Sequence, residues 1–112
     1  MSQPDDDRIA RFLEMVAEDP DNELALFSLG QALVDAGRQA DAEGYFARAY
    51  EIVPDLMMAW FRRAECLVAL GRYAEARPLA QKTLDLAIAQ NHVGPRGDAE
   101  ELLEEIDDAL DA

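Results

Sequence analysis

The 112-residue sequence has little cysteine, few aromatic residues and no long hydrophobic run, and each shortage excludes a class of protein. The single cysteine, Cys66, cannot form an intramolecular disulfide, which agrees with a reducing compartment. Aromatic residues make up 7% of the chain, and alanine and leucine far outnumber the β-branched residues that strands prefer. No run approaches the roughly 20 apolar residues of a membrane span, and the acidic start MSQPDDDR is unlike a signal peptide. We therefore expect a helical, cytoplasmic protein.

Positive charge is also scarce, and it is unevenly distributed. Ten Lys and Arg against 24 Asp and Glu give a net charge of −14. Residues 97–112 hold eight acidic residues and no basic one, residues 1–22 are acidic as well, and the segment between them is nearly neutral. Binding to phosphate needs clustered Lys and Arg, so we expect neither a nucleic-acid partner nor a membrane partner. The acidic C-terminal segment suggests a basic protein as one alternative partner, whose binding high salt would weaken.

Gly, Pro, Asp and Asn mark the ends of a helical pattern that otherwise continues along one domain, residues 1–112. This pattern predicts helices over about 5–18, 23–36, 40–53, 56–70 and 74–89. The stretch NHVGPRGD contains two glycines and a proline, so residues 91–97 are predicted to be a loop. The last predicted helix, 98–110, has one apolar stripe and is acidic on its other faces.

Two 21-residue segments, 26–46 and 60–80, are nearly the same and lie 34 positions apart. They share Phe27/Phe61, Leu33/Leu67, Val34/Val68, Gly37/Gly71, Arg38/Arg72, Ala40/Ala74 and Ala42/Ala76. The shared positions include the residues expected at a turn and at close helix contacts, whereas unrelated amphipathic helices would share only apolar positions. The chain therefore contains an internal repeat.

A 34-residue unit of two helices and a glycine turn resembles the tetratricopeptide repeat, whose pattern is W-x2-L-G-x2-Y, then A-x3-F, then P. Residues 23–56 match it at Leu26, Leu29, Gly30, Leu33, Ala42, Phe46, Ala49 and Pro54. Residues 57–90 keep Trp60, Ala64, Leu67, Gly71 and Ala76, but have Arg63, Ala80 and Ile88 where Leu, Phe and Pro are usual. Phe12 and Pro20 lie 34 positions before Phe46 and Pro54, so helix 5–18 looks like the second half of a truncated repeat.

The resemblance implies an all-α fold, a right-handed α-solenoid of antiparallel helix pairs. Its two full units, 23–56 and 57–90, would lie between an N-terminal half-repeat helix at 5–18 and an acidic C-terminal capping helix at 98–110. Repeats of this kind bury their apolar faces by stacking on one another.

The resemblance also implies that the first helix of each pair lines a concave groove, which receives a peptide or amphipathic helix of another protein. A helical wheel places these residues on that face: Leu24, Phe27, Gln31, Val34, Met58, Phe61, Arg62, Glu65 and Val68. Phe27 and Phe61 are the predicted anchors for the partner. Arg62 is the one cation of this strip, so we expect no clamp for a C-terminal carboxylate, for which the family uses Lys, Arg and Asn.

Two other occupants of this apolar strip stay open. The last helix could fold back over it, or a second copy of the chain could cover it, giving a self-associating structural protein.

Catalysis, a metal and a cofactor are not expected. His92 stands alone in the predicted loop, and Cys66 lies on an inner helix, where a small buried hydrophobe is expected. The C-terminal carboxylates lack the alternating Asp or Asn residues and the central Gly of a calcium loop.

Overall fold

The computed structural model describes residues 4–112, which form six α-helices joined by short turns. These helices are α1 (Pro4–Glu18), α2 (Glu23–Asp35), α3 (Gln39–Ile52), α4 (Met57–Ala69), α5 (Tyr73–Ala89) and α6 (Val93–Asp111). The described residues contain no β-strand, which confirms the predicted all-α fold. Within the same residues, no helix combines the length and the hydropathy that crossing a membrane requires.

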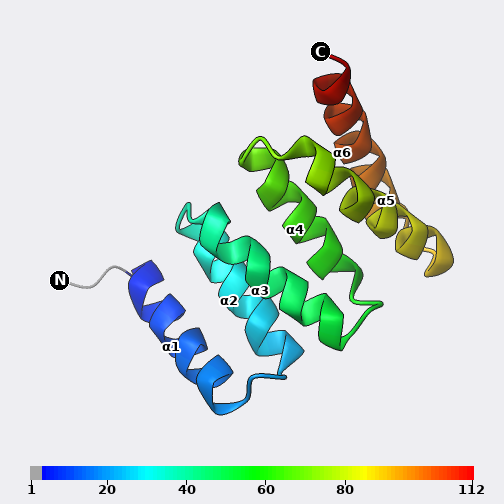
Figure 1. The fold of residues 1–112 in the computed structure, drawn as a ribbon. Coiled ribbons are helices and arrows are strands. Elements are labelled where there is room, and N and C mark those ends of the chain that lie inside the picture. Colours follow the sequence, from blue (N-terminus) through cyan, green and yellow to red (C-terminus); the bar gives the residue numbers. More distant parts are fainter. Residues whose placement is uncertain (1–3) are drawn as a thin grey trace.

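The helices are stacked in series, each packing against the next along the chain. Figure 1 shows α1 at one end of the stack and α6 at the other, so the first and last helices lie far apart. The molecule measures 43 × 30 × 21 Å, and its radius of gyration of 14.4 Å exceeds the roughly 13 Å typical of a compact domain of about 100 residues. This elongation follows from contacts that are made mainly between neighbouring helices.

The turns after α2 and α4 have the same geometry, as the repeat predicts. Gly37 and Gly71 adopt φ of 76° and 75°, which a residue with a side chain rarely adopts. The Arg38 amide donates to the Leu33 carbonyl at 2.8 Å, and the Arg72 amide donates to the Leu67 carbonyl at the same distance. These bonds satisfy carbonyl groups that the helix end leaves free, so each glycine closes its helix and reverses the chain.

The prediction of a loop over residues 91–97 is wrong, because α6 already begins at Val93. Pro95 is the third residue of α6, where a missing amide hydrogen costs nothing, since the first turn has no carbonyl to receive it. The Arg96 amide donates to the His92 carbonyl at 3.0 Å, and the Arg96 guanidinium binds Glu100 one turn later. The helix also continues to Asp111, so the acidic residues near its end do not terminate it early.

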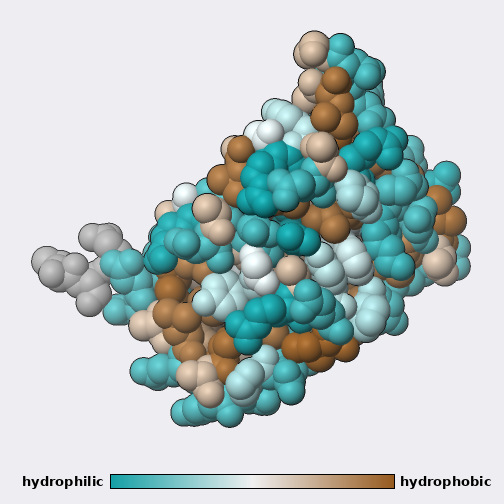
Figure 2. All heavy atoms as spheres, viewed as in Figure 1, coloured by the Kyte–Doolittle hydropathy of each residue, from teal (hydrophilic) through white to brown (hydrophobic). Residues whose placement is uncertain are grey.

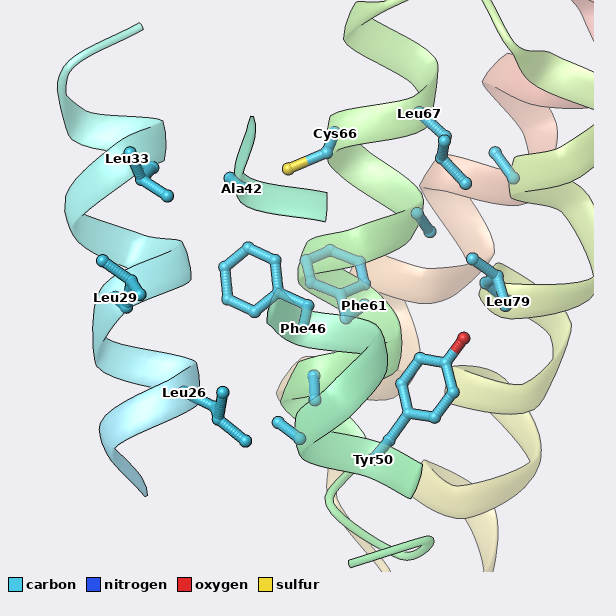
Figure 3. Close-up of a cluster of buried hydrophobic side chains, with 14 of the residues drawn as sticks. Leu26, Leu29, Leu33, Ala42, Phe46, Tyr50, Phe61, Cys66, Leu67 and Leu79 are labelled. Atoms are coloured by element: carbon cyan, nitrogen blue, oxygen red, sulfur yellow. The ribbon is translucent and has the colours of Figure 1, made fainter. Parts of the chain in front are cut away.

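Phe46 of α3 fills the centre of the first repeat and is fully buried. Figure 3 shows its ring between α2 and α4, facing Leu29. A β-carbon added at Gly30 would lie 2.8 Å from two atoms of this ring, so glycine at this position makes room for the phenylalanine. The second repeat has Ala64 and Ala80 at the corresponding positions, both fully buried. The first repeat thus pairs glycine with phenylalanine where the second pairs two alanines, and both arrangements are close-packed.

The contact between the two repeats is partly polar. The Arg63 guanidinium donates to Glu43 at 2.7 Å and to the Tyr50 hydroxyl at 2.6 Å, which links α4 to α3. Beside it, the Tyr50 and Trp60 rings stack with centroids 3.6 Å apart, and the Trp60 indole donates to the Pro54 carbonyl. Arg63, which departs from the family pattern, therefore has a half-buried acidic partner on the preceding helix.

Candidate functional site

Three alternate helices, α2, α4 and α6, line one grooved surface. The α4–α6 hollow has a volume of about 370 Å³ and is lined by Met58, Phe61, Arg62, Glu65, Asp98, Glu101, Leu102 and Glu105. The α2–α4 hollow has a volume of about 190 Å³ and is lined by Val34, Gln39, Arg62, Glu65, Cys66 and Ala69. Arg62 and Glu65 border both hollows, so the two hollows together form one surface, which we call the groove.

Five of the nine residues predicted for the concave strip border the groove, namely Val34, Met58, Phe61, Arg62 and Glu65. The other four, Leu24, Phe27, Gln31 and Val68, border neither hollow. Leu24 is 67% exposed at the start of α2, and Val68 is half-buried on α4. Contact of any of these residues with a partner stays a prediction.

The two aromatic residues predicted as anchors are held largely by their own chain. Phe61 is only 8% exposed and belongs to the core, although its ring borders the α4–α6 hollow. Phe27 is half-buried and packs edge-on against Phe46, with ring centroids 5.4 Å apart. Met58 is less deeply buried than Phe61 and lies in the same hollow. A partner would therefore find Met58 the more accessible apolar side chain there.

Arg62 lies at the centre of the groove. Its guanidinium donates to Glu65 at 2.8 Å, and its central carbon lies 5.9 Å from the centroid of the Phe61 ring. The Arg62 Nε is buried and has no acceptor within residues 4–112. On the neighbouring helix, hydrogen bonds from Arg8 and then from Gln31 lower the pKa of Asp35, and the charge of Arg62 adds a smaller effect.

The sequence prediction missed the contribution of α6 to this site, which consists of Asp98, Glu101, Leu102 and Glu105. α6 packs along α5 and contacts α4, so it forms a wall of the groove and does not fold back over the strip. The 34-residue period could have predicted this, because 34 residues after the start of the second unit at residue 57 is residue 91, just before α6 begins. The period alone therefore gives α6 the same place in the stack as α2 and α4.

Candidate catalytic and metal-binding groups are few. Within residues 4–112, no three His, Cys, Asp or Glu side chains lie close enough together to hold a metal ion. His92 is exposed at the residue before α6. Cys66 is 2% exposed, which confirms the prediction that it is buried. The groove thus offers shape, apolar surface and charge to a ligand.

The Cys66 thiol of the native protein is expected to react with a disulfide reagent such as DTNB at pH 8 about two orders of magnitude more slowly than a free cysteine. Burial, followed by the nearby carboxylates of Glu65 and Glu43, raises the pKa of the thiol from 9.0 to about 11, so very little thiolate is present. The release of thionitrobenzoate measures the rate. The same reaction in denaturant supplies the control. Equal rates in the two conditions would contradict the burial and the raised pKa of the Cys66 thiol.

Comparison with known proteins gives one family and several solved structures. The family described as tetratricopeptide repeat matches residues 8–56 and 57–91. No curated protein sequence matches the chain.

The similar solved structures are distant in sequence. The type III secretion translocator chaperone SycD of Yersinia enterocolitica shares 18% identity with a TM-score of 0.90, over 96% of this chain and 75% of that one. The TPR2B domain of yeast Sti1, solved as a complex with pHsp70, shares 18% identity with a TM-score of 0.81, over 89% and 80% of the two chains. A structure of MamA, described as MSR-1 C2, shares 20% identity with a TM-score of 0.65, over 92% and 66%. At these identities the likeness concerns the fold.

Proposed function

We propose, because the chain belongs to the tetratricopeptide repeat family, that it is a non-catalytic interaction module whose groove binds a peptide or helical segment of another protein. The observation that carries this proposal is the continuity of the two hollows across α2, α4 and α6. A domain of similar fold, TPR2B of yeast Sti1, has been solved in complex with pHsp70, which supports the same use of the fold. The predicted cytoplasmic location remains a prediction.

Replacing Met58 with arginine tests this proposal. Met58 borders the α4–α6 hollow and is half-buried, so a long charged side chain there would occupy the hollow while its end stays in solvent. We expect recovery of the partner in an affinity purification to fall at least about tenfold relative to the wild-type chain, as for a central interface residue. The matched control is Ala74→Arg, since Ala74 is exposed on α5 and borders neither hollow.

Both variants must first be shown by thermal unfolding to be folded. If Met58→Arg recovers the same partners as Ala74→Arg, the groove is not the binding site.

Self-association is the competing function. A further hollow of about 310 Å³ between α1, α2 and α3 is a second surface at which two copies of the chain could meet. Figure 2 shows hydrophobic residues beside α1 on that side of the molecule. Sedimentation velocity over a wide concentration range separates the two, because our proposal expects a monomer.

A further inference from the structure

The two walls of the α4–α6 hollow differ in chemistry. The α4 wall presents the apolar side chains of Met58 and Phe61, together with the Arg62–Glu65 ion pair. The α6 wall presents one apolar residue, Leu102, and three carboxylates, Asp98, Glu101 and Glu105. These carboxylates recur at intervals of three and four residues, which brings them to one face of the helix. The hollow therefore has an apolar side on α4 and an acidic side on α6.

The three carboxylates of the α6 wall make no ion pair within residues 4–112. All the ion pairs of this part of the chain use other acidic residues, and the two made by α6 use Glu100 and Asp107. Arg62 is the one cation that lines the hollow, and Glu65 holds it at 2.8 Å. Four carboxylates against one guanidinium leave the lining with a net charge of −3. A ligand that carries positive charge would relieve this repulsion.

We infer that the α4–α6 hollow binds a basic amphipathic segment of the partner protein, with an apolar side chain against α4 and Lys or Arg side chains against α6. This inference rests on the proposed function and specifies the partner's chemistry and orientation. A volume of about 370 Å³ lies within the range of roughly 300 to 1,000 Å³ typical of ligand sites, so the hollow has room for a large apolar side chain. On a helical segment, a Lys or Arg three or four residues from that side chain lies beside it, where it meets the acidic wall.

Other ligand chemistries fit this hollow less well. An acidic peptide or a C-terminal carboxylate would meet the net negative lining, and Arg62 is already engaged by Glu65. A nucleic acid would be repelled for the same reason. A metal ion would need three ligand side chains close together, and no such group exists within residues 4–112. A segment that carries both apolar and cationic side chains matches both walls at once.

Two designed probes test the inference directly on the full chain. One is a fluorescent amphipathic peptide with leucine on one face and lysine on the other, and its counterpart replaces every lysine with glutamate. Fluorescence anisotropy at about 50 mM NaCl is expected to show saturable binding of the lysine peptide alone. Raising the salt to about 300 mM should weaken that binding several-fold, because the carboxylates of the α6 wall are exposed to solvent and salt screens their charge.

A pair of matched variants then locates the binding. The groove variant, Asp98→Asn with Glu105→Gln, removes two charges from the α6 wall and is expected to raise the dissociation constant of the lysine peptide roughly tenfold at low salt. The control variant, Glu104→Gln with Asp111→Asn, makes the same chemical changes on exposed residues of α6 that do not line the hollow. We expect the control to change the dissociation constant less than about twofold.

Equal weakening by the two variants, or equal binding of the glutamate peptide, would overturn the inference. Failure of the inference is distinguishable from failure of the proposed function. If the lysine peptide does not bind but Met58→Arg still loses the natural partner, the groove binds a segment of different chemistry. If the natural partner is retained by Met58→Arg, the proposed function itself is wrong.

Discussion

Truncating Phe46 to alanine is expected to lower the free energy of unfolding by about 3–5 kcal/mol. The Phe46 ring is fully buried between α2 and α4, and it touches both the Gly30 backbone and the Phe27 ring, so removing it leaves a cavity that helices on two sides cannot easily close. A domain of this size has a total stability of roughly 5–15 kcal/mol. The midpoint of thermal unfolding, followed by circular dichroism, should fall by roughly 4–8 °C for each kcal/mol lost.

Phe12→Ala is the matched control for Phe46→Ala. Phe12 lies 34 positions earlier in the same sequence pattern, but it is only partly buried on α1, at the end of the stack. Because less surface returns to water there, we expect a loss of about 1–2 kcal/mol. Equal losses from the two substitutions would show that the position of a ring in the stack does not determine its contribution.

Replacing Gly30 with alanine is the second large change, and its expected sign is opposite to that of the same replacement elsewhere. Alanine usually stabilises a helix by about 0.8–1.0 kcal/mol relative to glycine. At Gly30, however, the new methyl group would lie 2.8 Å from two atoms of the buried Phe46 ring, and crowding of this kind costs about 1–3 kcal/mol. The net expectation is a destabilisation of up to about 2 kcal/mol, measured by urea unfolding.

Gly44→Ala tests whether crowding is the cause. Gly44 lies on the exposed side of α3 and has no atom within 4 Å of an added β-carbon, so alanine there should raise stability by up to about 1 kcal/mol. A double variant gives a second check, since Gly30→Ala should cost less when Phe46→Leu has already shortened the facing side chain. Additive costs would mean that the two residues do not interact.

The sequence could predict most of the helices because its end signals are local. Asn22, Gly37 and Gly71 act within one turn of their own position: the Asn22 side chain accepts from the Ala25 amide at 3.0 Å, and the two glycines adopt positive φ. The predicted start of α6 is wrong because proline and glycine interrupt a helix only in its interior. Both residues are tolerated in the first turn of a helix. Whether they lie in a first turn depends on where the helix starts, and the sequence does not fix that residue.

The groove could be predicted in part. The 34-residue period placed Met58, Phe61, Arg62 and Glu65 on one face of α4, and the structure sets all four against the α4–α6 hollow. The prediction lacks the acidic wall because it starts the last helix at residue 98 and treats it as a cap, whereas α6 starts at Val93 and lines the groove. Only the packing of α6 on α5 and α4 fixes which of its faces meets the groove.

The polar contact between Arg63 and Glu43 has a consequence for how such a chain can be rearranged. The two glycine turns lie inside the units and share one geometry, so they do not distinguish one unit from the other. The seam between them is not interchangeable, because a unit that carries Arg63 needs a preceding unit that offers Glu43 and Tyr50. Placed after any other neighbour, that guanidinium would enter the seam without a counter-ion, at a large cost. The order of the units is therefore encoded at their shared boundary, and a chain with the units exchanged would pack poorly there even if both glycine turns formed.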